Sequence, residues 1–561
     1  MNRKAYGILL TVVFLAFSFL TGCGSSSTTT TTPPPPPPST SNFVFSLNGQ
    51  EEINEGPNYY ALAGVVSVTA AGSVTAGEQD YNDAFGITSP EPGGDAITGG
   101  TLTVSSSTGQ GTLTLNTNNT NLGLAGVETL GVQFVNANHA LITQFDGTAT
   151  SSGSLDLQVL PAALSGSFAF TMAGVDPGYF PIGFGGVFTI GGAAPNGTVD
   201  FNDDGTSATN QALTISLGTP DASGRGAITS GLAYGATAIA FNYYIVGAEA
   251  IRIIDVDAGD SAVGSAFGQG SGSFTNASLP ASVLAISQGA DGFGSEYGVA
   301  GQFATNSTPV PATFTGVGED NELDDSYLSP LASAFAGTYT VAGNGYGSMT
   351  VTGGLGGGGV SLLQLYLTDP ALNISDPNNT SGGGGGLVLD LDTISDFAGG
   401  LGVVIPQTDA TATDFNGNYA AGWQEFNYFT GCGDCEFDMA TQGTMTGGAL
   451  SLTGLVSDPF ETLAAGATTE NTATFAGTPL ADAVNTGRST MLSTNTTPNP
   501  LVPAIGTYIT PFDLVIYQAS AGQLFWLDFN TANDDVFLGP IEQQGTLTGI
   551  PAVVKNQAKQ K

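Results

Sequence analysis

The strongest constraint on the fold is a strand-rich unit that recurs four times along the 561 residues. Each copy has an apolar run closed by an aspartate, at Ala140–Asp146, Ala250–Asp255, Ala371–Asp376 and Leu524–Asp528. About thirty residues earlier each copy has a run that begins with glycine, at Gly109–Thr114, Gly224–Thr229, Gly345–Thr350 and, less closely, Gly487–Leu492. The repeat spacing of about 110 to 150 residues is that of whole domains, not of solenoid turns. The sequence therefore predicts four tandem modules of one fold.

The second copy indicates the secondary structure most clearly. In the run Ala238–Val246 the apolar side chains alternate with a period of two, which is typical of a half-buried strand. Gly, Asn, Asp and Pro separate similar short runs, and no segment has a convincing helical period. About eight short strands joined by turns predict an all-β, antiparallel meander in each module. An up-and-down β-barrel, which leaves no exposed edge, is favoured over a two-sheet β-sandwich.

The N-terminus has the features of an export signal. A basic start precedes an apolar run from Ile8 to Leu20, which is too short for a transmembrane helix. Residues 20–23 (Leu-Thr-Gly-Cys) resemble the lipobox of bacterial lipoproteins, with Cys23 in the invariant position. The resemblance implies cleavage before Cys23, a diacylglycerol on its sulfur, and acylation of the new N-terminus, for example with palmitate. Gly24 follows, and in that family this indicates the outer membrane, with the periplasmic and cell-surface faces both open.

Composition also indicates how the chain is organised behind the signal. The segment 23–41 is rich in Ser, Thr and Pro and cannot bury a core. Its six consecutive prolines, Pro33–Pro38, predict a polyproline II rod of roughly 19 Å that separates a folded body from a membrane. We therefore expect a signal peptide at 1–22, a tether at 23–41, β modules at 42–160, 161–280, 281–409 and 410–550, and a basic tail at 551–561.

The charge balance limits the possible partners. The chain has 47 acidic residues, and between Ala5 and Val554 the only basic residues are Arg225, Arg252 and Arg488. Nucleic acids and anionic lipid head groups need a cationic surface, so we expect neither as a partner. An acidic exterior is compatible with simple solubility and also with divalent cations.

Cys432 and Cys435 form a C-x-x-C pair in an exported chain. A structural zinc site needs four ligands, and His139 is the only histidine. A redox motif of the thioredoxin type would open a helix in a βαβ unit, whereas this pair lies between strand-like segments. We therefore expect a local disulfide.

One turn-like segment has the ligand spacing of a calcium loop. Asp200, Asn202 and Asp204 alternate along the chain and are followed by Gly205, so their oxygens could converge on one hard cation. The twelfth position is Gln211, where an EF-hand has a bidentate glutamate. A hairpin turn explains the same residues, so calcium is an alternative and no cofactor is required. The repeated Asp146, Asp255, Asp376 and Asp528 are likewise expected to be turn residues after a strand.

The shared motifs resemble an uncharacterised β-repeat family common in acidobacterial exported proteins. That family has a G-x-F-T-like strand, an acidic D-x-N turn, a G-R-G-T-L-T-like strand and a Phe-Asp passage. The resemblance covers residues 42 to 545, more closely in the first two copies than in the last two. It implies a β-repeat architecture and export, and it implies no activity.

The sequence contains no recognisable catalytic constellation. There is no G-x-S-x-G elbow, and His139 has no counterpart in the other copies. We expect a non-enzymatic, lipid-anchored envelope protein that serves adhesion, surface architecture or capture of an extracellular glycan or protein. The alternative is an envelope-anchored polysaccharide hydrolase that uses a pair of carboxylates, although nothing selects such a pair among the acidic residues.

Overall fold

The described residues of the computed structural model all belong to one unit, Ser39–Lys561. The structure describes residues 40–554 except 52–57, 84–85, 88–93, 145, 147, 162, 177, 179, 204, 235–236, 258–259, 291–295, 323–331, 354, 356–358, 380–381, 394–398, 410–415, 425–437, 447–448, 458–470, 493, 497–512, 529–535 and 537. Apart from a short 3₁₀ turn, η1 (Asn276–Ser278), the elements in this part are strands. None of the described helical segments is long and apolar enough to cross a membrane.

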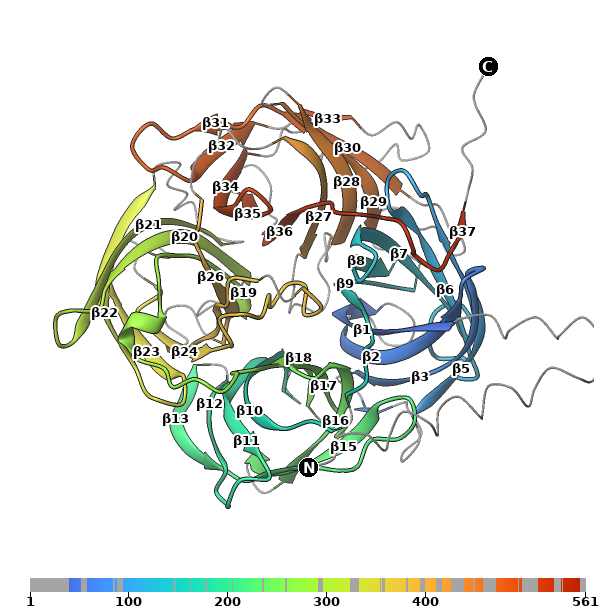
Figure 1. Cartoon of the computed structure of the whole chain (residues 1–561), viewed down its shortest axis with the longest axis horizontal. Helices are drawn as coiled ribbons and strands as arrows, with labels where there is room; N and C mark the ends of the chain where they lie inside the picture. The colour runs from blue at the N-terminus through green and yellow to red at the C-terminus, as the bar shows by residue number, and fades with distance from the viewer. Residues whose placement is uncertain are drawn as a thin grey trace, which may run out of the picture. The chain divides into compact units, whose positions relative to one another are not determined.

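The strands form four antiparallel sheets in chain order, which we call modules 1 to 4 (Figure 1). Module 3 is a closed eight-stranded barrel in which each strand pairs with the next and the last pairs with the first. Its strands are β19 (Ser282–Ala290), β20 (Glu296–Asn306), β21 (Ala312–Glu322), β22 (Ser333–Val341), β23 (Tyr346–Thr352), β24 (Leu362–Leu367), β25 (Gly386–Asp390) and β26 (Leu401–Pro406). The prediction of tandem, all-β barrel modules is confirmed.

Module 1 closes in the same way, because β5 pairs with both β3 and β6. Its strands are β1 (Thr40–Glu51), β2 (Asn58–Thr69), β3 (Ser73–Asp83), β4 (Gly86–Ile87), β5 (Asp95–Val104), β6 (Gln110–Thr117), β7 (Val127–Asn136), β8 (His139–Gln144) and β9 (Ala149–Leu157). The last strand of the chain, β37 (Val553–Val554), adds to β5 in parallel.

In module 2 the strand equivalent to β5, which closes the barrel of module 1, is divided into two short strands. Its strands are β10 (Gly166–Val175), β11 (Pro181–Ile190), β12 (Gly197–Asp203), β13 (Thr206–Leu213), β14 (Ile215–Leu217), β15 (Arg225–Tyr234), β16 (Thr237–Gly247), β17 (Ala250–Asp255) and β18 (Ser261–Gly268). β13 pairs with β12 and β14 pairs with β15, and only Thr214 separates β13 from β14. The segment 206–217 therefore joins the two ends of the sheet.

Module 4 repeats this arrangement with β30 paired to β29 and β31 paired to β32. Its strands are β27 (Gly417–Gln424), β28 (Asp438–Thr446), β29 (Ala449–Ser457), β30 (Asn471–Gly477), β31 (Leu480–Ala481), β32 (Arg488–Leu492), β33 (Thr494–Thr496), β34 (Asp513–Ser520), β35 (Gln523–Asp528) and β36 (Leu538–Gln543). Corresponding strands can thus be compared across all four modules.

Each barrel has its own apolar core, and a further cluster of buried residues is shared by the modules. In β16, Phe241, Tyr243 and Ile245 belong to the core of module 2, as the alternation in the sequence predicted. The residues between them, Tyr244 and Val246, belong to the shared cluster. Because successive side chains of a strand point to opposite faces, this strand is buried on both, and the prediction of a half-buried strand is wrong here. The outer faces of the modules thus pack together through apolar contacts.

Candidate functional site

The glycine-started runs of the four repeats occupy equivalent places in the four modules. Each run begins with a glycine at positive φ, a conformation that L side chains rarely adopt. The next residue is the first residue of a strand, which is β6, β15, β23 or β32 in modules 1 to 4. These glycines are Gly109 (φ 73°), Gly224 (φ 91°), Gly345 (φ 78°) and Gly487 (φ 96°). The residue that follows each glycine is Gln110, Arg225, Tyr346 or Arg488, and it lies opposite Gln133, Tyr244, Tyr366 or Tyr517, respectively.

In the contact between modules 1 and 2, these residues bind a buried acid of the preceding module. Asp80 on β3 is fully buried and accepts hydrogen bonds from Arg225 Nε and Nη2 at 2.8 and 2.7 Å. The Tyr244 hydroxyl donates to the same carboxylate at 2.7 Å. Two residues further along β3, Asn82 donates to the backbone oxygen of Asp255 at 3.1 Å. We call this arrangement an acid junction.

A second acid junction joins modules 2 and 3 and uses two of the calcium candidates. The Asp200 carboxylate accepts hydrogen bonds from the hydroxyls of Tyr346 and Tyr366, both at 2.8 Å. Asn202 donates to the backbone oxygens of Asp390 and Asp392 at 3.1 and 2.9 Å. Burial raises the pKa of Asp200, although its hydrogen-bond donors partly offset this effect.

The third member of the calcium pattern, Asp204, lies outside the described residues. Asp200 and Asn202 themselves lie within β12, ahead of the hairpin turn that leads to β13. Besides the N–H of Asn210 in module 2, the groups that hydrogen-bond to their side chains belong to module 3, so the structure assigns them a role in joining modules. Calcium binding stays a prediction.

The third acid junction joins modules 3 and 4. Glu319 on β21 accepts a hydrogen bond from Arg488 Nε at 2.6 Å and another from the Tyr517 hydroxyl. Asn321, two residues further on, donates to the backbone oxygen of Asp528 at 2.9 Å. An acid, an Asn two residues later, and a pair of donor side chains from the next module thus recur at three successive contacts.

The contact between modules 4 and 1 is built differently. By strand register, Leu455 and Ser457 of β29 occupy the positions of the acid and the Asn, while module 1 has Gln110 and Gln133 at the donor positions. Here Asp438 on β28 accepts hydrogen bonds from two hydroxyls of β9, those of Thr150 and Ser152, at 2.9 and 2.5 Å.

Two of the four repeated aspartates are turn residues as predicted, one is corrected, and for Asp528, which ends β35, the turn stays a prediction because residues 529–535 lie outside the described part. Asp146 and Asp255 accept hydrogen bonds from the backbone N–H groups of Thr148 and Asp257, two residues later, as predicted. In module 3 the prediction chose the wrong residue. Asp390 ends the equivalent strand and accepts from the N–H of Asp392 at 2.9 Å, whereas Asp376 lies in the loop between β24 and β25. The apolar passage before Asp376 resembles a strand because its leucine and isoleucine are buried in the shared cluster.

The third arginine, Arg252, belongs to a buried ionic cluster. Its Nη2 donates to Asp156 at 2.5 Å, and the same carboxylate lies 2.8 Å from His139 Nδ1. Glu542 of module 4 lies 3.6 Å from His139 Nε2. Burial alone would lower the pKa of His139, but Glu542 and Asp156 outweigh it and raise the pKa well above 6.5. Burial alone would raise the pKa of Asp156, but Arg252 and His139 lower it to about 2.

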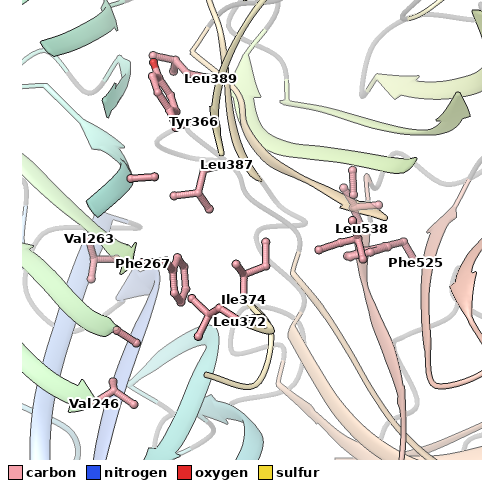
Figure 2. Close-up of a cluster of buried hydrophobic side chains, with 14 of the residues drawn as sticks. Val246, Val263, Phe267, Tyr366, Leu372, Ile374, Leu387, Leu389, Phe525 and Leu538 are labelled. Atoms are coloured by element: carbon pink, nitrogen blue, oxygen red, sulfur yellow. The ribbon is translucent and has the colours of Figure 1, made fainter. Parts of the chain in front are cut away.

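A pocket of about 390 Å³ lies beside Arg252, and residues of all four modules line it. Examples are Leu141 from module 1, Phe267 from module 2, Leu387 from module 3 and Trp423 from module 4. Figure 2 shows Phe267, Ile374 and Leu387 near one another, with Phe525 and Leu538 together on the facing side. This size falls within the range of about 300–1,000 Å³ that is typical of small-molecule sites.

Other predicted site residues lie outside the described part. Cys23, Cys432 and Cys435 are among them, so the lipid anchor and the local disulfide stay predictions. The described residues contain no group of three or more His, Cys, Asp or Glu side chains placed to hold a metal ion. The residues that sequence reasoning missed are the three arginines. Their signal was present, because they are the only basic residues in the body of an acidic chain and two of them follow the repeated glycine.

Comparisons with known proteins add little to this picture. No family model matches the chain, and no curated protein matches it. Among solved structures, a double mutant of transferrin binding protein B from Haemophilus parasuis Hp5 is 10% identical over 79% of this chain and 93% of its own, with a TM-score of 0.19. A single mutant of that protein (10% identical; 72% and 82% covered; TM-score 0.17) and the Aeromonas veronii immune modulator A (10% identical; 69% and 95% covered; TM-score 0.14) also match. Likenesses this weak carry no argument about function.

Proposed function

We propose that this chain is a non-catalytic, lipid-anchored envelope protein that captures an extracellular ligand where its four β modules meet. The observation that carries the proposal is the pocket, because every module contributes to its lining. A site of this kind exists only while the modules are held together. The three acid junctions and the contacts of Asp438 supply that connection.

The lining also bears on the alternative function. A polysaccharide hydrolase would need two carboxylates roughly 5 to 9.5 Å apart at its site. The described residues that line this pocket include no aspartate or glutamate. We therefore propose capture in preference to hydrolysis.

The proposed location rests on the N-terminal sequence. The lipobox, the tether and the likeness to acidobacterial exported repeat proteins together support a lipid anchor at Cys23 in the outer membrane. The tether would then hold the modules away from the membrane surface, where a ligand can reach them.

Replacing Cys23 by Ala tests the anchor. We expect the variant to lose incorporation of radiolabelled palmitate and to move from the membrane fraction to the soluble fraction, because acyl chains supply the membrane affinity. Globomycin should make the wild-type chain accumulate as the uncleaved precursor. If Cys23→Ala leaves both labelling and fractionation unchanged, the chain is not a lipoprotein.

A thermal-shift screen tests capture at the pocket. The mature chain with Cys23→Ala, which needs no detergent, is heated with panels of glycans, peptides and small apolar molecules. A ligand that binds only the folded state stabilises it and so raises the Tm. At a ligand concentration one hundred times the Kd, the free energy of unfolding rises by about 2.7 kcal/mol. We expect at least one compound to raise the Tm, and the effect to disappear when Ser287→Phe partly fills the pocket. A ligand whose effect survives that substitution would place capture elsewhere.

A further inference from the structure

The lining of the pocket differs in charge from the rest of the chain. The sequence has 47 acidic residues, yet none of them is among the described residues of this lining. The lining has one charged residue in its described part, Arg252. The described part of the lining is therefore almost uncharged in a strongly acidic protein.

Arg252 already has a counter-ion, and only its Nε has no hydrogen-bond partner among the described residues. It is 7% exposed, and its Nη2 donates to Asp156 at 2.5 Å and to Ser154 at 2.8 Å. Its Nη1 donates to Ser265 at 2.5 Å. Because Asp156 already balances the guanidinium, an anionic ligand would enter without a free cation, and a cationic ligand would lie beside Arg252.

Most of the remaining lining is apolar. Aliphatic and aromatic side chains from all four modules line this space, and Figure 2 shows four of them, Phe267, Ile374, Leu387 and Phe525. The neutral polar groups include two amides: Gln288 Nε2 donates to Gln424 Oε1 at 2.8 Å, and Gln424 Nε2 donates to the backbone oxygen of Asn48 at 2.9 Å. In such a lining the burial of apolar ligand surface is favourable in free energy, and the burial of an unpaired charge is unfavourable.

On the basis of the function proposed above, we propose that the ligand of this pocket is an uncharged, mainly apolar small molecule. A single neutral polar group on the ligand could be accommodated at the amides and serines of the lining. This chemistry differs from that of a glycan, whose many hydroxyls would lose their hydration against the aliphatic part of the lining.

Two fluorescent probes that share one ring skeleton test the charge selectivity. N-phenyl-1-naphthylamine is neutral, and 8-anilino-1-naphthalenesulfonate is the same skeleton with an added sulfonate. The chain has two tryptophans; Trp423 lines the pocket and lies 4.8 Å from Trp526, centroid to centroid. Energy transfer from tryptophan therefore reports a probe bound in this part of the protein, and the Ser287→Phe variant below shows whether it is bound in the pocket. With the detergent-free Cys23→Ala chain, we expect the neutral probe to bind at least tenfold more tightly than the sulfonate.

Two substitutions of the same kind provide the control. Ser287→Phe adds bulk inside the pocket, and Ser333→Phe adds the same bulk at a half-buried position of the same module away from it. We expect Ser287→Phe to weaken the neutral probe at least tenfold and Ser333→Phe to leave its Kd unchanged. If the sulfonate binds as tightly as the neutral probe or more tightly, and Ser287→Phe weakens that binding, the proposed ligand class is wrong. Capture at the pocket would still stand. If neither probe binds, or if binding ignores Ser287→Phe, the inference is wrong, and the thermal-shift screen then decides separately whether the pocket captures anything.

Discussion

Replacing Arg225 by Gln lowers the free energy of unfolding by about 3–5 kcal/mol, because it leaves the Asp80 carboxylate buried without its cation. Asp80 is fully buried and Arg225 is 7% exposed, so water cannot replace the lost partner. The remaining donors, Tyr244 and Asn242, are neutral. The loss is measured by urea titration followed by circular dichroism.

Two variants separate the charge from the side chain itself. Asp80→Asn in combination with Arg225→Gln removes the uncompensated charge and keeps an acceptor for Tyr244. We therefore expect the double variant to be more stable than the single variant by about 2 kcal/mol or more. Gln110→Ala changes the equivalent position of module 1, whose side chain donates to no buried acid among the described residues, and should cost less than about 1 kcal/mol. If Gln110→Ala costs as much as Arg225→Gln, the acid junction has no special role.

The barrels were predictable because their signal is local. In β16 the alternation of Phe241, Tyr243 and Ile245 with other residues requires only a period of two. The glycine before each donor residue was recognisable because a positive φ restricts the residue type. Both signals lie within a few consecutive residues, so a single sequence displays them.

The contacts between modules were not predictable, because they join residues far apart in the chain. Asp80 and Arg225 are separated by 145 positions, and nothing near Asp80 shows that its partner is an arginine of the next repeat. The same D-x-N spacing that binds two tyrosines at Asp200 also fits a calcium loop. The pocket was likewise hidden, because four modules each supply part of its lining.

Raising the pH from 5 to 8 should destabilise the protein by several kcal/mol. Burial raises the pKa of Glu128 from 4.5 to about 8, with Asp146 and Asp95 adding to the rise and the hydrogen bond from Gln79 opposing it. A carboxyl with a raised pKa keeps its proton in the folded state while the unfolded chain releases it. Its contribution to stability is therefore complete below pH 4.5 and is lost as the pH rises towards 8. At 1.36 kcal/mol per pH unit, this is on the order of 3–5 kcal/mol from Glu128 alone.

Glu128→Gln isolates this effect from the general repulsion of an acidic chain. Glutamine keeps an acceptor for the Gln79 amide, which donates to Glu128 at 2.6 Å, but it has no proton to lose. We expect the variant to lose stability less steeply between pH 5 and 8, as measured by Tm across a buffer series; the remaining slope includes Glu51 and Asp260, whose pKa values burial raises to about 7 and about 6. The loss of stability between pH 3.8 and 2 provides the control. The pKa of Asp156 is lowered to about 2, so its contribution to stability is present above pH 3.8 and disappears as the pH falls towards 2. Because Asp156 and Glu128 are separate groups, Glu128→Gln should leave the loss of stability below pH 3.8 unchanged. If the stability of this variant falls as steeply between pH 5 and 8 as that of the wild type, Glu128 is already ionised in the folded protein at pH 5.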